Sequence, residues 1–552
     1  MSELFARMAR RPSATAMLLL ASLMVNLLGL ASSLYVIQVL NRYVGYGVGA
    51  TLVTLTIGAM IAIIAEHVFR RLRLRLAEEI VGDADERTAT GVYGLLVTAR
   101  VDALEKRPAG ERAELVRGIE RAEQALGPSN LAAVTDAPYS LLFLAALGLL
   151  SVPLAGIAVV FCLASLGLAW HNQRRLAHPL RILSGLGVRS NALTMATISG
   201  ADTIRQFRGA PLLQERWRAT SAQARATRAA LAFSQSESAS VGQAMQALMG
   251  VGVIGVGAML VVHGQLDVGA LIGANLIAAR ALAPLTRLVQ MSGALKDAEQ
   301  SLANARRFAG ISPEPAGRKI LPGWNGRLEF QAVGLMFPGA VSALFSALSF
   351  TLDPCGVMVV TGRNGTGKSS LMRLISGLIE PSRGQILVDG VDLRQIALDW
   401  WRCQISYLPQ EPLFLDGSVR ENLLAARPGT IEADIMRCLD FVGLRAFVDR
   451  NPAGLDQFLV NGGHNLAPGL RRRLAMARAM LVDGPLFLLD EPSEGLDREG
   501  AEAVYSLLID VSRRGKTLVV ISHDPVILRS ARLLLRFDGA EPVLVQAAPG
   551  VA

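Results

Sequence analysis

The sequence predicts an α-helical membrane domain of six spans, followed by an α/β domain. Of the 552 residues, 51% are hydrophobic, and the mean hydropathy is +0.38, which is too apolar for an ordinary soluble protein. The long apolar runs end before residue 290, and beyond residue 326 short apolar runs alternate with helical stretches, as in α/β domains. We therefore expect a membrane domain at 1–310, a Pro/Gly-rich linker at 311–326 and a second domain at 327–552.

Six apolar runs are each long enough to cross a bilayer as a helix. They cover roughly residues 14–40, 48–69, 130–150, 153–172, 241–263 and 267–289. Arginines follow the second and fourth runs, which predicts that those ends and the N-terminus lie in the cytoplasm. The outside turns are expected at 41–47, 151–153 and 263–265. The first run is too long for a signal peptide, so we interpret it as a span.

The basic balance of the chain, a net charge of +9, has two interpretations. It could reflect nucleic-acid binding, but the arginines track the ends of the apolar runs, which favours a multi-pass protein of the cytoplasmic membrane without a nucleic-acid partner. The four cysteines, Cys162, Cys355, Cys403 and Cys438, show no C-x-x-C spacing. We expect isolated buried thiols rather than a disulfide framework or a zinc site.

Asp136 is an acidic residue at the entry of the third apolar run. A carboxylate inside a span could line a transport pathway or hold a proton. The alternative, which we favour, is a residue at the start of a helix near the membrane interface, with Pro138 in the first turn.

Residues 362–369 form a phosphate-binding loop, G-R-N-G-T-G-K-S, between an apolar run at 357–360 and a helical stretch at 370–375. Backbone N–H groups and the helix N-terminus would hold phosphates. Lys368 would reach the β- and γ-phosphates of ATP, and the Ser369 hydroxyl would bind Mg²⁺. The predicted nucleotide-binding residues of this segment are Gly362, Arg363, Asn364, Gly365, Thr366, Gly367, Lys368, Ser369 and Ser370.

Three further apolar runs end in polar residues that suit ATP hydrolysis. Asp490 and Glu491 follow the run at 485–489. Asp490 would hold Mg²⁺, directly or through water, and Glu491 would polarise the attacking water. His523 would contact the γ-phosphate, and Gln410 would contact Mg²⁺ and the water. The sequence thus predicts a catalytic group of three side chains and a metal site shared by Ser369, Gln410 and Asp490.

The chain resembles ABC exporter half-transporters over essentially its whole length. Residues 362–369 match the Walker A loop, Asp490 the Walker B aspartate, Glu491 the catalytic glutamate, Gln410 the Q-loop, His523 the H-loop and Asp497 the D-loop aspartate. Phe337 stands where the family places an aromatic that stacks on adenine, although a core phenylalanine is the alternative. The resemblance implies an ATPase coupled to transport, with ATP and Mg²⁺ as cofactors.

The family's signature, L-S-G-G-Q, departs to L-A-P-G-L at residues 466–470. In the family this motif of one subunit covers the ATP held by the other subunit. Ala467 has no hydroxyl and Pro468 has no N–H, so two donors are lost. Both ATP sites of a homodimer would then be poor. We therefore expect a heterodimer, in which a partner with an intact signature completes the site built on this chain's Walker loop.

Within the family, segments 135–144 and 279–285 are similar to type I secretion permease/ATPases, and the short N-terminus places the chain nearer the protease-exporter branch. This resemblance implies export of an unfolded polypeptide, with a membrane-fusion protein and an outer-membrane channel as further partners. Two alternatives stay open. One is an exporter of small molecules or lipids, and the other is a regulatory subunit with little ATP turnover of its own.

Overall fold

The protein is described here from a computed structural model that covers residues 2–45, 47–310, 314, 319–337, 340, 342–538 and 542–546. The chain divides into two compact units, one of Met1–Ala99 with Ala103–Ile311 and the other of Arg100–Asp102 with Ser312–Ala552. Of the expected linker, residues 311–313 and 315–318 lie outside the described residues. Each unit is considered by itself.

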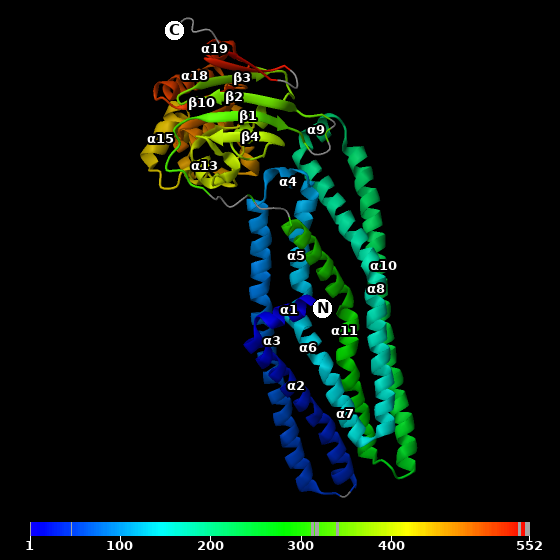
Figure 1. The fold of residues 1–552 in the computed structure, drawn as a ribbon. Coiled ribbons are helices and arrows are strands. Elements are labelled where there is room, and N and C mark those ends of the chain that lie inside the picture. Colours follow the sequence, from blue (N-terminus) through cyan, green and yellow to red (C-terminus); the bar gives the residue numbers. More distant parts are fainter. Residues whose placement is uncertain are drawn as a thin grey trace. The chain divides into compact units, whose positions relative to one another are not determined.

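The first unit consists of long helices that lie side by side (Figure 1). The helices before residue 310 are α1 (Ser2–Arg10), α2 (Pro12–Gln38), α3 (Gly49–Thr98), α4 (Val101–Glu105), α5 (Ala109–Ala125), α6 (Pro128–Asp136), α7 (Ser140–Leu150), α8 (Val152–Ser199), α9 (Ala201–Gln206), α10 (Ala210–Val262) and α11 (Val268–Ala309), with the short helices η1 (Val39–Val44) and η2 (Ala137–Tyr139). Helix α2 packs along α3, while α8, α10 and α11 pack on one another.

Six helical segments among the described residues are long and apolar enough to cross a membrane, which confirms the predicted six-span class. They are Pro12–Val44, Gly49–Thr98, Pro128–Leu150, Val152–Ser199, Ala210–Val262 and Val268–Ala309. Several exceed the roughly 20 residues that a bilayer requires, so polar extensions continue the same helices. The turn expected at residues 41–47 is wrong for residues 41–44, which continue the helix as the π-helix η1 (Val39–Val44).

Asp136 does not start a helix, so the favoured expectation for this residue is wrong. It is the last residue of α6, and the chain stays helical through η2 into α7. Its carboxylate forms an ion pair with Arg73 of α3 and accepts a hydrogen bond from Asn26 Nδ2 at 3.1 Å. Charge pairing between helices, rather than capping, therefore explains the position of this carboxylate.

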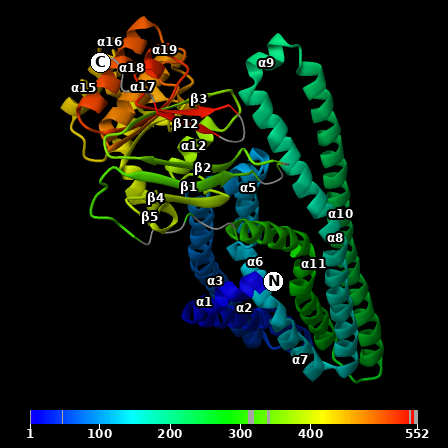
Figure 2. The same cartoon turned by 45° about the horizontal axis from the view of Figure 1, so that its top comes forward.

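Helix α11 contains a proline, Pro284, in its interior. Proline has no N–H, so it cannot donate to the carbonyl four residues earlier, that of Arg280, and its ring crowds the same carbonyl. Helix α11 curves along its length (Figure 2). The bend thus has an identifiable source in the sequence.

The second unit has the predicted α/β composition. Its strands are β1 (Leu328–Leu335), β2 (Phe345–Leu352), β3 (Val357–Gly362), β4 (Arg383–Val388), β5 (Val391–Asp392), β6 (Ile405–Leu408), β7 (Gly417–Ser418), β8 (Phe458–Leu459), β9 (Leu486–Asp490), β10 (Thr517–Ile521), β11 (Leu533–Phe537) and β12 (Val543–Gln546). Its helices are α12 (Lys368–Ile375), α13 (Leu398–Cys403), α14 (Val419–Ala426), α15 (Glu432–Phe441), α16 (Arg445–Arg450), α17 (Pro468–Val482), α18 (Arg498–Arg513) and α19 (Pro525–Arg529).

Two large sheets, a two-stranded sheet of β7 and β8, and two apolar cores organise this unit. The larger sheet has the order β12-β11-β3-β10-β9-β6, and the smaller has the antiparallel order β2-β1-β4-β5. Strands β9 and β10 are buried along their whole length, as expected for parallel strands covered on both faces. Helices α15 to α18 gather apart from strands β1, β2 and β4 (Figure 2). Trp401 anchors one core and donates from Nε1 to Ile375 O at 2.7 Å.

The cysteine expectation is wrong for two of the four residues. Cys162 is buried in α8, but Cys355 and Cys403 are exposed. Cys355 lies in the tight turn between β2 and β3 with φ of 60°, and Cys403 ends α13. Turns and helix ends lie at the surface, which hydrophobicity alone does not reveal.

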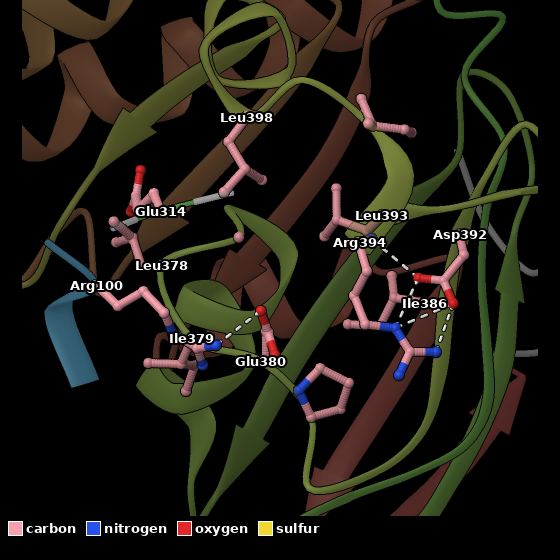
Figure 3. Close-up of a pocket in the computed structure, with 13 residues that line it drawn as sticks. Arg100, Glu314, Leu378, Ile379, Glu380, Ile386, Asp392, Leu393, Arg394 and Leu398 are labelled. Atoms are coloured by element: carbon pink, nitrogen blue, oxygen red, sulfur yellow. Dashed lines mark hydrogen bonds and ion pairs between the residues drawn. The ribbon is translucent and has the colours of Figure 1, made fainter. Parts of the chain in front are cut away.

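A small apolar hollow also lies within the second unit (Figure 3). Ile379, Ile386 and Leu398 line it, and at its edge Arg100 forms an ion pair with Glu380 at 3.0 Å. None of the predicted nucleotide-binding residues lines this hollow.

Candidate nucleotide-binding site

The predicted site residues gather at one edge of the larger sheet. Strands β3, β10, β9 and β6 are neighbours and parallel, so their carboxyl ends lie along the same edge. The Walker loop follows β3, His523 follows β10, Asp490 ends β9 and Gln410 follows β6. Open α/β sheets bind ligands at this edge. The topology therefore brings together groups that are far apart in the sequence.

The phosphate-binding loop has a backbone that its glycines allow. Gly362, Gly365 and Gly367 have φ of 138°, 80° and 104°, a region that other residues rarely adopt. A Cβ at Gly362 would lie 2.2 Å from Phe537 O, so the neighbouring strand β11 excludes any side chain there. Helix α12 begins at Lys368, within the last two residues of the loop, which leaves its first N–H groups free to bind an anion.

Lys368 is buried, and its ammonium is held by the loop. Nζ donates to Gly362 O at 2.6 Å and to Arg363 O at 3.0 Å. Burial lowers the pKa of Lys368, while Glu491 and Asp490 act in the opposite direction. Thr366 Oγ1 also donates to Arg363 O, at 2.7 Å, so the loop is closed on itself in a shape ready for phosphate.

Asp490 is 2% exposed at the end of β9. Burial raises the pKa of its carboxyl, whereas a hydrogen bond with the Ser369 side chain and the charge of Lys368 lower it. Its Oδ1 is buried without a hydrogen-bond partner. Such an orphaned oxygen requires a compensating donor or a cation.

These oxygens fit Mg²⁺. The described residues contain no group of three His, Cys, Asp or Glu side chains that could enclose a metal. Magnesium does not need one, because it is bound through one or two carboxylates together with substrate phosphates. Asp490 and the Ser369 hydroxyl would hold the ion. The amide of the third predicted ligand, Gln410, donates from Nε2 to Glu494 at 3.2 Å.

Glu491 combines a strained backbone with a half-buried carboxylate. Its φ of 47° is unusual for a residue with a side chain, and its N–H donates to Ile521 O at 2.9 Å. Glu491 Oε1 lies 3.5 Å from His523 Nε2. Burial raises the pKa of Glu491, and His523 lowers it. A carboxylate with a raised pKa is better matched to taking a proton from water than an ordinary glutamate is.

Two arginines of α17 contribute contacts that sequence reasoning missed. Arg472 donates from Nη2 to Gln410 O at 2.6 Å and from Nη1 to Glu494 O. Arg473 pairs with Asp497 and, at 3.3 Å, with Glu499. The run of three arginines was visible in the sequence, but not which of them turn inward. The helical period of the apolar residues in α17 was the available signal.

The signature segment lies at the start of α17. Ala467 is the N-cap residue and Pro468 occupies the first helical position. Alanine offers no side-chain cap, and the helix has no side-chain hydrogen bond at this end. The N–H groups of Gly469 and Leu470 remain as donors in the first turn. The loss inferred from the sequence thus falls at the tip of a helix.

Phe337 follows β1 and is 41% exposed, so it is not a core phenylalanine. An exposed ring can offer a face to an adenine base. Pro338 and Gly339, which follow it, lie outside the described residues.

Together the fold and the site define a six-span membrane protein with a nucleotide-binding domain. Residues 15–285 match the model of the ABC transporter transmembrane region, and residues 345–494 match the model described as ABC transporter. The chain is an ABC exporter half-transporter, and its second domain is an ABC ATPase domain whose hydrolysis is coupled to transport.

Relatives and a solved structure cover nearly the whole chain. The type I secretion system ATP-binding protein PrsD of Rhizobium meliloti is 28% identical over 94% of this chain and 88% of its own. The cyclolysin secretion/processing ATP-binding protein CyaB of Bordetella pertussis is 27% identical over 95% and 74%. A bacterial Atm1-family ABC exporter with ATP bound has a TM-score of 0.84 at 19% identity, covering 96% of this chain and 95% of that one. This last likeness shows the fold alone.

Proposed function

We propose that this half-transporter uses ATP and Mg²⁺ to export an unfolded polypeptide across the cytoplasmic membrane, as half of a dimer with a non-identical partner. The carrying observation is the contrast within its ATPase domain. Lys368, Asp490 and Glu491 supply the groups that would bind phosphate and orient the attacking water. The signature end instead starts with Ala467, which has no side-chain hydroxyl, and Pro468, which has no N–H.

The polypeptide substrate is supported by the relatives. PrsD is described as a type I secretion protein, and CyaB as a cyclolysin secretion/processing protein. By analogy, a membrane-fusion protein and an outer-membrane channel would be further partners. The similarity to an Atm1-family exporter keeps an exporter of another substrate class as the second candidate.

Roles follow for the individual site residues. Asp490 and Ser369 would hold Mg²⁺, with Gln410 joining when nucleotide binds. Glu491 would orient the attacking water, and His523 would contact the γ-phosphate. Phe337 would stack on adenine. The residues of the loop at 362–370 would bind the phosphates, mainly through backbone N–H groups. The cytoplasmic arginines would place the ATPase domain at 327–552 in the cytoplasm.

The test compares the chain alone with the chain co-purified with a half-transporter that carries an intact L-S-G-G-Q signature and is encoded beside it. ATPase activity should be low for the homodimer and high for the mixed dimer. Robust turnover by the homodimer would contradict the heterodimer. Nucleotide binding without hydrolysis in both assemblies would instead support a regulatory subunit.

Substrate class needs a separate measurement in inverted membrane vesicles. The mixed dimer should protect an added unfolded polypeptide from external protease in an ATP-dependent way. A matched preparation with Glu491→Gln in this chain should give no protection. Protection in that control, or none in the active dimer, would contradict polypeptide export.

A further inference from the structure

We propose that a cavity within the membrane domain binds a carboxylate of the transported molecule, an inference that rests on the proposed export function. The cavity has a volume of about 320 Å³ and lies among helices α2, α3, α6, α7 and α11. We call it the arginine pocket. Its charged lining residues are Glu66, Arg70, Arg73, Asp136, Arg280 and Arg287.

The arginine pocket has an excess of positive charge. Arg70 pairs with Glu66, and Arg73 pairs with Asp136. Four arginines and two carboxylates leave a net charge of +2 (4 − 2), carried by Arg280 and Arg287. Within the described part of the chain, neither of these two arginines has an ion pair. The pocket therefore has capacity for an anionic group from outside the chain.

Arg280 is held in place rather than free to reach the membrane surface. Its Nη2 donates to Ser32 Oγ at 3.0 Å. On the other side, a Cβ at Gly29 would lie only 2.5 Å from Arg280 Nη1, so the absence of a side chain at Gly29 makes room for the guanidinium. The same Cβ would lie 3.9 Å from Cζ of Phe143, which closes the space on that side. A fixed guanidinium loses little freedom when it binds a carboxylate through its planar fork.

Arg73 supplies a second, buried donor to this site. It is 5% exposed, and its Nε has no hydrogen-bond partner. Its Nη1 and the Nδ2 of Asn26 both contact Asp136 Oδ1. Buried donors are seldom left unsatisfied without a functional reason. The wall of the pocket is thus a built polar network and not a loose surface cluster.

The depth of Arg280 distinguishes a transported molecule from a lipid headgroup, although Arg70 and Arg73 of the same pocket lie just past the end of the apolar run at 48–69. Helix α11 starts at Val268, twelve residues earlier (280 − 268). At 1.5 Å per residue, Arg280 lies about 18 Å along a helix that crosses an apolar layer about 30 Å thick. Headgroup phosphates stay at the edge of that layer. Charges at such depth face a cavity or a pathway.

The test measures peptide binding to the full chain in lipid nanodiscs. The probes are three fluorescent peptides of equal length, in which glycine alternates with glutamate, lysine or serine, and the readout is fluorescence anisotropy. The glutamate peptide should bind most tightly. Arg280→Gln should weaken it about tenfold, the effect of losing one charge-assisted hydrogen bond. Arg71→Gln is the matched control, since Arg71 lies on α3 beside Arg70 but does not line the pocket.

A second variant keeps every charge and addresses misfolding. Gly29→Ala should displace the Arg280 guanidinium and also weaken the glutamate peptide, whereas Gly58→Ala, with open space around it, should not. Thermal unfolding of each variant shows whether it folds. Equal binding of the lysine peptide, or unchanged binding in both Arg280→Gln and Gly29→Ala, would overturn the proposal.

Two further readouts separate the rival explanations. If raising the phosphatidylglycerol fraction of the nanodisc displaces the glutamate peptide, and Arg280→Gln abolishes that competition, the site belongs to a lipid headgroup and the proposal fails. Arginine-dependent peptide binding without vesicle export would support the pocket while removing polypeptide export. Export that is unaffected by Arg280→Gln would support polypeptide export and overturn the role of the arginine pocket.

Discussion

Two helix N-termini in the ATPase domain face the same chemical task with different equipment. Helix α12 starts at Lys368, after three glycines with positive φ, and its lysine is poised on the loop carbonyls. Helix α17 starts with Ala467 and Pro468 and has only backbone donors from Gly469 onward. Both ends have the partial positive charge of a helix. The two ends therefore differ in side-chain donors and glycine geometry rather than in the helix dipole.

The comparison also separates the groups that this chain supplies itself from those that a partner chain would have to supply. The α12 end has beside it the buried Asp490, whose Oδ1 has no hydrogen-bond partner, and the half-buried carboxylate of Glu491, whose pKa is raised by burial. The α17 end has backbone donors but no side-chain hydrogen bond at its N-cap. This asymmetry is what a mixed dimer would exploit, and each prediction below tests it.

The largest effect is expected from Glu491→Gln in the mixed dimer. It removes the carboxylate that we propose takes the proton from water, while it keeps the size of the side chain and its capacity for hydrogen bonding. General-base catalysis contributes about 10²- to 10⁴-fold, so kcat should fall at least a hundredfold. Nucleotide binding, measured by equilibrium titration, should stay within a few-fold. Retained turnover would mean that the α12 end is not the working half.

The second prediction removes the difference between the two helix ends by restoring the missing donors at the start of α17. Ala467→Ser together with Pro468→Gly restores a hydroxyl and an N–H at the helix tip. One regained charge-assisted hydrogen bond is worth about 1.5–3 kcal/mol. ATPase activity of the homodimer should therefore rise about tenfold or more. Ala467→Val with Pro468 kept is the matched control and should give no gain.

The third prediction concerns Arg472, which lies on α17 and contacts the Gln410 segment at the same sheet edge as the phosphate-binding loop. Arg472 contacts the carbonyls of Gln410 and Glu494, so Arg472→Gln should loosen the Gln410 segment without touching the phosphate loop. We expect a few-fold loss of kcat and a higher Mg²⁺ concentration for half-maximal activity. Arg471→Gln, which removes a contact to His464 instead, is the control. An unchanged Mg²⁺ dependence would assign Arg472 a purely structural role.

The smallest effect is a shift in the pH profile. Because burial raises the pKa of Glu491, its basic form is lost at a higher pH than for an ordinary glutamate as pH falls. The acid limb of kcat should therefore lie above about pH 4.3, the usual glutamate value. His523→Ala removes a group that lowers this pKa and should move the limb further up. A limb that moves down would contradict the assignment.

Sequence reasoning reached the six spans, the α/β class and the Walker loop because each depends on local patterns. Apolar length, alternation of short runs and the spacing of glycines are all readable in one dimension. It could not find pairs between distant residues. Asp136 and Arg73 are 63 residues apart, and only the packing of α3 on α6 reveals their ion pair.

The same limit applies to orientation. The run of arginines at 471–473 marked a basic helix, but the direction of each side chain depends on how α17 packs. Likewise, Cys355 was expected to be buried because cysteine usually is, whereas a turn holds it at the surface. Tertiary context decided these positions.

Pro284 gives α11 a mechanical property that its length would otherwise conceal. A helix of 42 residues with every rung in place resists bending as a single rod. The missing hydrogen bond to the carbonyl of Arg280 divides this helix into two segments that meet near Arg280 and can bend relative to each other there. A tilt of the segment that ends at Ala309 should therefore be taken up near Arg280, and not passed on in full to the segment that starts at Val268.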